Sequence, residues 1–196
     1  MKKKLSKRLK KLIESSKDKK ITTVEEVIKK VKLNCNAKFD ESIDVAFRLN
    51  LKQKKGEATL RTTVNLPNGN GRKIKVAVLC EDNKIKEAEQ SGADLCGSDN
   101  LINDITAGKI KFDKLVATPS MMSKMGKLGK ILGPKGLMPN PKLGSVTNDL
   151  KQAVTNAKSG QVEIKNDKDG NIGLSLGKKS FSDDKLLKNF NAVFEV

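Results

Sequence analysis

The hydrophobic pattern changes its period twice along the chain, and this change constrains the fold more than any other feature. Apolar and polar side chains alternate, as they do in strands with one face in water, in four segments: 41–50, 58–66, 161–166 and 171–176. Residues 74–79 and 114–118 are instead continuous apolar runs, typical of parallel strands covered on both faces. We therefore expect an antiparallel part built from both ends of the sequence and a parallel part between them.

Helical periodicity and capping residues fill the gaps between these strands. Helices are predicted at 22–31, 83–92, 99–108, 147–160 and 181–196. The first has a capping box, formed by Thr22 with Glu25 or by Thr23 with Glu26. Its predicted buried face consists of Val24, Val27, Ile28 and Val31. Thr147 and Ser182 are the expected caps of the last two helices.

These elements predict a discontinuous two-domain protein of mixed α/β and α+β class. Residues 1–69 and 159–196 are expected to form an antiparallel α+β sandwich, in which 41–50 pairs with 58–66 and 161–166 pairs with 171–176. Residues 70–158 are expected to form an inserted three-layer α/β domain, which is Rossmann-like. The two connections between the domains would act as a hinge.

The charge of the chain predicts a polyanionic partner. Lys and Arg number 40 against 23 Asp and Glu, so the net charge is +17. Histidine is absent, which excludes histidine metal sites and histidine-based catalysis. The three cysteines are too far apart for a zinc knuckle or a disulfide framework, and no apolar run is long enough to span a membrane.

The segment GKILGPKGLMPNPK, residues 129–142, alternates glycine and proline among lysines. Glycine and proline together predict a stiff loop with no room for a helix or a strand, and its lysines predict contact with phosphate. One alternative is a nucleotide-binding α/β enzyme that uses this loop. Its spacing does not fit a Walker loop, however, and Glu81 and Asp82 follow the first parallel strand, where they would repel a pyrophosphate. With only six phenylalanines and no other large aromatic residue, the chain favours a folded RNA over stacked single strands.

Several motifs resemble one known family. The sequence GPKGLMPNPK, with AKFDESIDV (37–45), VNLPNGNGRKIKVAV (64–78) and VEIKNDKDGNIG (162–173), closely resembles the ribosomal protein L1 family. The resemblance covers nearly the whole chain. It implies a non-enzymatic structural constituent of the large ribosomal subunit without a cofactor, located in the cytoplasm or, as an alternative, in an organelle.

The resemblance also implies partners. Proteins of this family bind the stalk of the large-subunit ribosomal RNA, assist the release of deacylated tRNA from the exit site, and repress translation of their own mRNA. No membrane partner is implied, and the free protein is expected to be a monomer.

The expected RNA-binding residues fall into three groups. By resemblance, Lys38, Phe39 and Asp40 match a family contact element, although Phe39 is equally compatible with a place in the core. The second group is Arg48, Lys52, Lys54 and Lys55, on the first alternating strand and the turn after it, where simple solvation is the alternative to phosphate contact. The third group is Lys130, Lys135 and Lys142 on the glycine-proline loop, which are expected either to make a secondary contact with folded RNA or to keep the shape of the loop for stalk motion.

One departure from the family pattern lies at the end of the sequence. Members continue past the last helix into a strand that carries a Thr-Met-Gly-Pro motif, whereas the present sequence ends at Val196. An extended form is expected to be more stable and to bind RNA more tightly, because an added strand would cover a sheet edge and supply further contacts.

Overall fold

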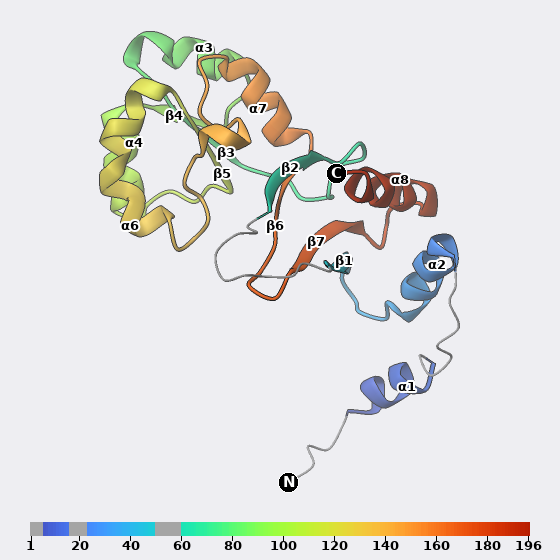
Figure 1. The fold of residues 1–196 in the computed structure, drawn as a ribbon. Coiled ribbons are helices and arrows are strands. Elements are labelled where there is room, and N and C mark those ends of the chain that lie inside the picture. Colours follow the sequence, from blue (N-terminus) through green and yellow to red (C-terminus); the bar gives the residue numbers. More distant parts are fainter. Residues whose placement is uncertain (1–5, 16–22, 50–59) are drawn as a thin grey trace.

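The computed structural model describes residues 6–15, 23–49 and 60–196 (Figure 1). It is a mixed α/β protein with two antiparallel strand pairs and one parallel sheet. The helices are α1 (Lys7–Ser15), α2 (Val24–Asn34), α3 (Ile85–Gln90), α4 (Asp99–Thr106), α5 (Met122–Met125), α6 (Gly129–Leu132), α7 (Leu150–Lys158) and α8 (Asp183–Phe194). The strands are β1 (Ser42–Arg48), β2 (Arg61–Asn65), β3 (Val76–Leu79), β4 (Leu95–Gly97), β5 (Lys114–Ala117), β6 (Gln161–Lys165) and β7 (Asn171–Lys178).

The antiparallel pairs join strands from opposite ends of the sequence. Strand β1 pairs with β7, and β2 pairs with β6. The predicted pairing of 41–50 with 58–66 is therefore wrong. The predicted hairpin at 161–176 is confirmed only at its turn, where Gly170 N donates to Asp167 O and Asn166 forms an antiparallel bridge with Ile172. Beyond the turn its two strands separate and pair with β2 and β1. Alternation shows which face of a strand is buried, but the partner is chosen by packing between distant segments.

One apolar cluster lies between these strands and helices α2 and α8. Its buried members are Ile28, Ile43, Val64, Leu66, Ile164, Ile172, Leu174, Leu176, Leu186 and Val193. Along β7 the buried residues alternate with exposed or half-buried ones from Asn171 to Leu176. The predicted strands with one wet face are thus confirmed.

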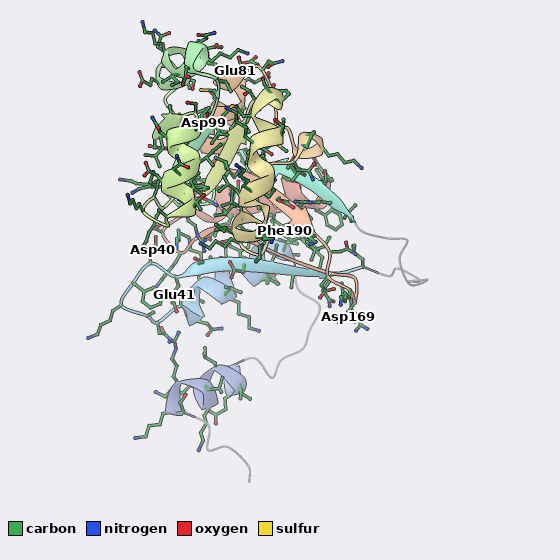
Figure 2. All side chains as sticks on the ribbon, turned by 90° about the vertical axis from the view of Figure 1, so that its left-hand side faces the viewer. Asp40, Glu41, Glu81, Asp99, Asp169 and Phe190 are labelled. Atoms are coloured by element: carbon green, nitrogen blue, oxygen red, sulfur yellow. The ribbon has the colours of Figure 1, made fainter. Side chains whose placement is uncertain are left out.

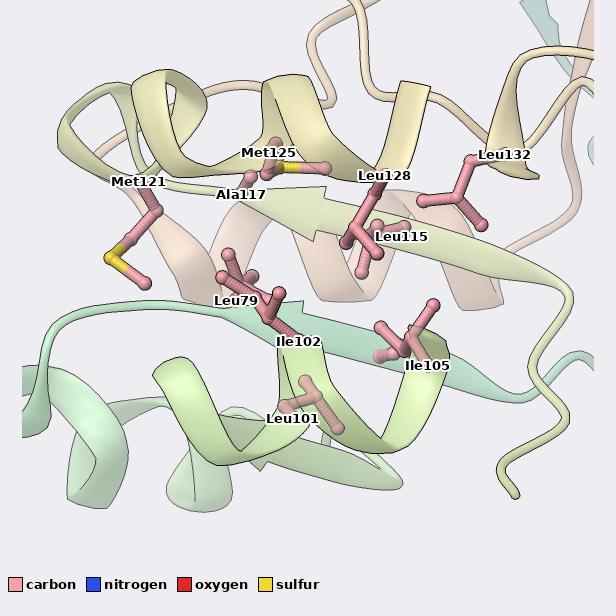
Figure 3. Packing of buried hydrophobic residues seen from close by; sticks show 11 residues of the cluster. Leu79, Leu101, Ile102, Ile105, Leu115, Ala117, Met121, Met125, Leu128 and Leu132 are labelled. Carbon is pink, nitrogen blue, oxygen red and sulfur yellow. The ribbon is translucent and has the colours of Figure 1, made fainter. Parts of the chain in front are cut away.

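The parallel sheet has the order β4-β3-β5, and every side chain of β3 is fully buried. Helices α3 and α7 pack on one face of the sheet. Helix α4 and the segment 119–132 pack on the other, where Leu101, Ile102 and Ile105 meet Leu79 and Leu115 (Figure 3). The continuous apolar runs therefore correspond to strands covered on both faces. Strand β4 was not predicted, because its three residues are too few to show a period.

The first part of the glycine-proline loop is helical, so the prediction that it leaves no room for a helix is wrong. Residues 119–132 form a series of short helical turns that ends with α6. Met121, Met125, Leu128 and Leu132 recur every three or four residues and are all buried (Figure 3). Burial of this stripe outweighs the low helix propensity of Gly126 and Gly129.

Two of the three expected helix caps are confirmed. Thr23 Oγ1 accepts a hydrogen bond from Glu26 N, and Ser182 Oγ accepts one from Lys185 N. The cap of α7 is Asp149 rather than Thr147, because the Asp149 carboxylate reaches Gln152 N at 3.0 Å. No helix within the described residues is both long enough and apolar enough to cross a bilayer.

Helix α2 buries much less than its sequence predicts. Of the expected buried face only Ile28 is buried, whereas Val24, Val27 and Val31 are 37%, 44% and 40% exposed. The helix lies at the margin of the fold, where α8 is its main helical neighbour. Only the side of α2 with Ile28 is covered, whereas Val24, Val27 and Val31 are partly in contact with solvent.

The chain passes between the antiparallel and parallel parts at two points that touch each other. Gly69 has a φ of 65° and Gly160 a φ of 98°. A Cβ added to Gly160 would lie 2.6 Å from Gly69 Cα, so only glycine fits there. Asn189 of α8 is fully buried beside this crossing, donates to Gly69 O at 2.9 Å and accepts from Asn68 N at 3.1 Å. The Asn189 side chain thus holds the two connections together through hydrogen bonds.

The apolar core divides in the same way as the predicted domains. Every buried member of the two clusters around the parallel sheet lies between Val76 and Ala157, and the third cluster draws on residues before and after this range. We propose on this basis that residues 70–158 form a domain of their own.

A fragment of residues 70–158 is expected to fold alone, because both faces of its sheet are covered by its own helices. The measurements are circular dichroism, thermal unfolding and limited proteolysis. A matched fragment with Val78→Asp, which buries an unpaired charge in the centre of the sheet, should be unfolded. Lack of a cooperative transition in the unmodified fragment, together with a folded full chain, would show that the insertion is not an independent domain.

Candidate nucleic-acid interface

Residues 35–41 connect α2 to β1, and hydrogen bonds to the end of β7 fix this segment in place. The Asp40 carboxylate accepts from Ser180 N at 3.1 Å and from Ser180 Oγ at 2.7 Å. At the other end of the segment, Lys179 Nζ donates to Cys35 O at 2.6 Å. Both ends are thereby held by two consecutive residues of one loop.

Glu41 closes the segment on itself. Its carboxylate accepts from Ala37 N at 3.2 Å and from the Arg8 guanidinium at 2.9 Å. The hydrogen bond from Ala37 is the largest cause of a lowered pKa of Glu41. Burial opposes it, and the bond from Arg8 lowers the pKa further. The carboxylate therefore stays ionised, and its hydrogen bonds persist, in neutral solution.

Lys38 and Phe39 are presented to solvent by this fixed segment. Phe39 is 73% exposed and Lys38 is exposed as well. Phe39 is therefore not a core residue. The aromatic cluster of this part of the protein is instead formed by Phe47, Phe190 and Phe194, with ring centroids 5.8 to 6.4 Å apart. In the free protein this ring buries little of its surface and is accessible to a partner.

Asp40 has a different environment from its two neighbours. Its two carboxylate oxygens accept the two hydrogen bonds from Ser180, so its charge is directed toward the protein. Figure 2 shows Asp40 and Glu41 together at one end of β1. Both carboxylates hydrogen-bond to backbone groups and so hold the segment that carries Lys38 and Phe39.

The remaining expected contacts lie elsewhere in the fold. Arg48 is exposed at the far end of β1, opposite Asn171 and roughly 20 Å from Ser42 along the strand. Lys52, Lys54 and Lys55 lie outside the described residues. The structure therefore does not bring Arg48 next to Lys38.

The glycine-proline loop presents Lys130, Lys135 and Lys142 as exposed side chains. Its path is fixed at Asn140, where Oδ1 accepts from Lys142 N at 2.9 Å and the backbone N–H donates to Ser145 Oγ at 2.7 Å. Gly136 has a φ of 68°, a left-handed conformation that favours glycine. The loop is thus stiff, as its composition predicts.

The inner side of this loop faces strands β2 and β6 across a cavity of about 240 Å³. Lys114 and Glu163 are among the residues that line it, and Lys114 Nζ donates to Gln161 O. Burial lowers the pKa of Lys114, an effect that the nearby Glu163 carboxylate opposes. The inner side of the loop borders this cavity. The side of the loop accessible to a macromolecular partner is therefore the one with the exposed Lys130, Lys135 and Lys142.

A comparison with known families assigns the chain. The sequence model described as the ribosomal protein L1p/L10e family matches residues 28–196. The chain belongs to this family. Residues 1–27, and with them α1, lie outside the match.

Bacterial L1 proteins are close relatives over most of the chain. The large ribosomal subunit protein uL1 of Pelagibacter ubique (strain HTCC1062) is 64% identical over 190 residues, which cover 97% of this chain and 83% of the relative. The uL1 proteins of Rickettsia peacockii and Rickettsia conorii are each 49% identical over 168 residues, covering 86% of this chain and 70% of the relative. The chain is therefore an L1 protein of the bacterial type.

Membership of the L1 family makes this a structural protein of the large ribosomal subunit and not an enzyme. L1 proteins are part of the ribosome, which in bacteria lies in the cytoplasm. The thiols agree with a non-catalytic role, since burial raises the pKa of Cys80 to about 11 and keeps it protonated. Among the described residues, no group of three acidic or cysteine side chains is placed to hold a metal ion.

Sequence reasoning missed the residues that hold the 35–41 segment in place. Ser180, Lys179 and Arg8 bond to it from positions far away in the sequence. Nothing local marks them, because a serine or lysine after a strand is equally common on an ordinary surface. Only the pairing of β1 with β7 brings the loop after β7 to this place.

Proposed function

We propose that the chain binds the stalk of the large-subunit ribosomal RNA, with Lys38 and Phe39 as the main contact. The observation that carries the proposal is the 73% exposure of Phe39 on a segment fixed by Asp40 and Glu41. Membership of the L1 family supports the choice of partner. The net charge of +17 supports a polyanion independently.

The chemistry of the two side chains is complementary. A lysine ammonium neutralises a phosphate, and a phenylalanine ring packs against a ribose or an unstacked base in a folded RNA. Because the segment is ordered before binding, little conformational entropy is lost on association. Lys130, Lys135 and Lys142 supply a secondary contact under the same proposal, and so does Arg48 at the other end of β1.

We further propose the two activities that the resemblance implies. Movement of the stalk with this protein assists the release of deacylated tRNA from the exit site. Binding of a similar RNA structure in its own mRNA represses translation. Both rest on the same surface, since one protein face would recognise one RNA shape in two molecules.

The test is filter binding of an RNA copy of the stalk helix and its junction, over a series of salt concentrations. If about six phosphates are neutralised, the slope of log K against log salt is expected to be about −4 to −6. A stem-loop of the same length with an unrelated fold serves as the control and should bind more weakly. A flat salt response, or equal affinity for both RNAs, would contradict the proposal, and tight ATP binding with turnover would support the nucleotide-binding alternative.

A further inference from the structure

Helix α1 carries a dense positive charge that nothing above explains. Its nine residues include Lys7, Arg8, Lys10 and Lys11, and its acidic residue is Glu14. The helix lies outside the residues that the L1 family model matches. It stands apart from the two packed parts of the fold (Figure 1).

The charges of α1 do not serve the stability of the helix. Helices favour acidic residues in the first turn and basic ones in the last, and α2 has this arrangement, with Glu25 and Glu26 at its start and Lys32 at its end. Helix α1 has no acidic residue in its first turn and no basic residue in its last. Its positive charge is concentrated where the helix dipole is itself positive.

Repulsion among the lysines adds to this cost. Lys7 and Lys11 are four residues apart and Lys7 and Lys10 three apart, so each pair lies on one side of the helix. Like charges at these spacings destabilise a helix by a few tenths of a kcal/mol per pair. The three lysines are all exposed. A bound polyanion would offset both the unfavourable interaction with the helix dipole and the repulsion between the lysines.

A salt bridge places α1 beside the proposed RNA contact. The Arg8 guanidinium lies 2.9 Å from the carboxylate of Glu41, whose side chain is only 16% exposed. Glu41 closes the segment that presents Lys38 and Phe39. Figure 2 shows α1 below β1, on the side away from the parallel sheet.

We propose that α1 is a second RNA-binding element, which contacts phosphates of the same structured RNA through Lys7, Lys10 and Lys11, while Arg8 anchors the helix to Glu41. This inference rests on the proposed function. Under this inference, α1 adds positively charged RNA contacts to those made by residues 28–196, which the family model matches.

The test compares two triple variants in the salt series with stalk RNA. Lys7→Gln, Lys10→Gln and Lys11→Gln remove three charges from α1 and keep both its helix propensity and the Arg8–Glu41 pair. The slope is expected to become less steep by about 2 to 3, since each lost phosphate contact contributes 0.7 to 0.9. The matched control, Lys86→Gln, Lys109→Gln and Lys111→Gln, removes the same charge from exposed positions around the parallel sheet and should keep the slope of the unmodified chain.

The outcomes separate this inference from the proposed function. If the unmodified chain binds the stalk RNA with a steep slope and both triple variants behave alike, α1 is not an RNA-binding element, although the proposed function stands. If the unmodified chain does not prefer the stalk RNA to the control RNA, both are overturned. Binding to vesicles of phosphatidylglycerol and phosphatidylcholine provides a third arm, because loss of vesicle binding in the α1 variant without a change in the RNA slope would assign the helix to a lipid surface instead.

Discussion

Replacing Asn189 by leucine is expected to lower the free energy of unfolding by about 3–5 kcal/mol. The Asn189 amide is fully buried and bonds to three backbone groups: Asn68 N at 3.1 Å, Gly69 O at 2.9 Å and Leu176 O at 2.7 Å. Leucine has a similar volume but leaves these groups without a partner, and each unsatisfied buried group costs about 1–3 kcal/mol. Urea unfolding followed by circular dichroism measures the change.

The control for this prediction lies two residues further along α8. Asn191 is exposed, and its side chain makes no hydrogen bond to another described residue. Asn191→Leu should therefore change the stability by no more than about 0.5 kcal/mol. Equal stabilities of the two variants would show that the amide of Asn189 does not hold the crossing.

Replacing Phe39 by alanine is expected to weaken binding of stalk RNA by about 30-fold, or roughly 2 kcal/mol. Such a loss is typical when an aromatic side chain is removed from the centre of an interface or from a stacked base. The salt slope should not change, because no positive charge is lost. Stability should not change either, since Phe39 is 73% exposed in the free protein. Filter binding at several salt concentrations and thermal unfolding test the three expectations together.

Phe194 provides a matched control, because it is another phenylalanine that is 72% exposed. It lies on α8 beside Phe47 and Phe190, in the aromatic cluster rather than on the 35–41 segment. Phe194→Ala should bind RNA as tightly as the unmodified chain. If Phe39→Ala binds equally tightly, Phe39 is not part of the interface and the exposed ring needs another explanation.

Those features of the fold that depend on neighbouring residues could be predicted from the sequence. The alternation in β7, the apolar run of β3 and the caps Thr23 and Ser182 are local signals, and the structure confirms each. The pairing of β1 with β7 was not predictable, because a strand pattern contains no information on its partner. The segment from Met121 to Leu132 was mispredicted for another reason. Its apolar side chains recur at helical spacing and are buried, and this burial outweighs the low helix propensity of its glycines.

The candidate site, too, has residues that could be predicted from the sequence and contacts that could not. Lys38 and Phe39 were identified through motif resemblance, and the structure shows both on the surface. The hydrogen bonds of Asp40 to Ser180 and of Glu41 to Arg8 depend on the tertiary fold. Asp40 stays a predicted contact, and its hydrogen bonds to Ser180 could not be predicted from the sequence.

The pairing of β1 with β7 also sets an order of events during synthesis. Ser42 and Lys178, which face each other across the pair, are 136 residues apart in the sequence. At the usual rates of chain elongation, β1 leaves the ribosome roughly ten seconds before its partner. The domain proposed for residues 70–158 would fold in this interval through contacts of its own, and its folding would bring Gly69 toward Gly160. Until β6 and β7 are synthesised, β1 and β2 lack their partners, and unpaired strand edges of this kind favour aggregation of the nascent chain.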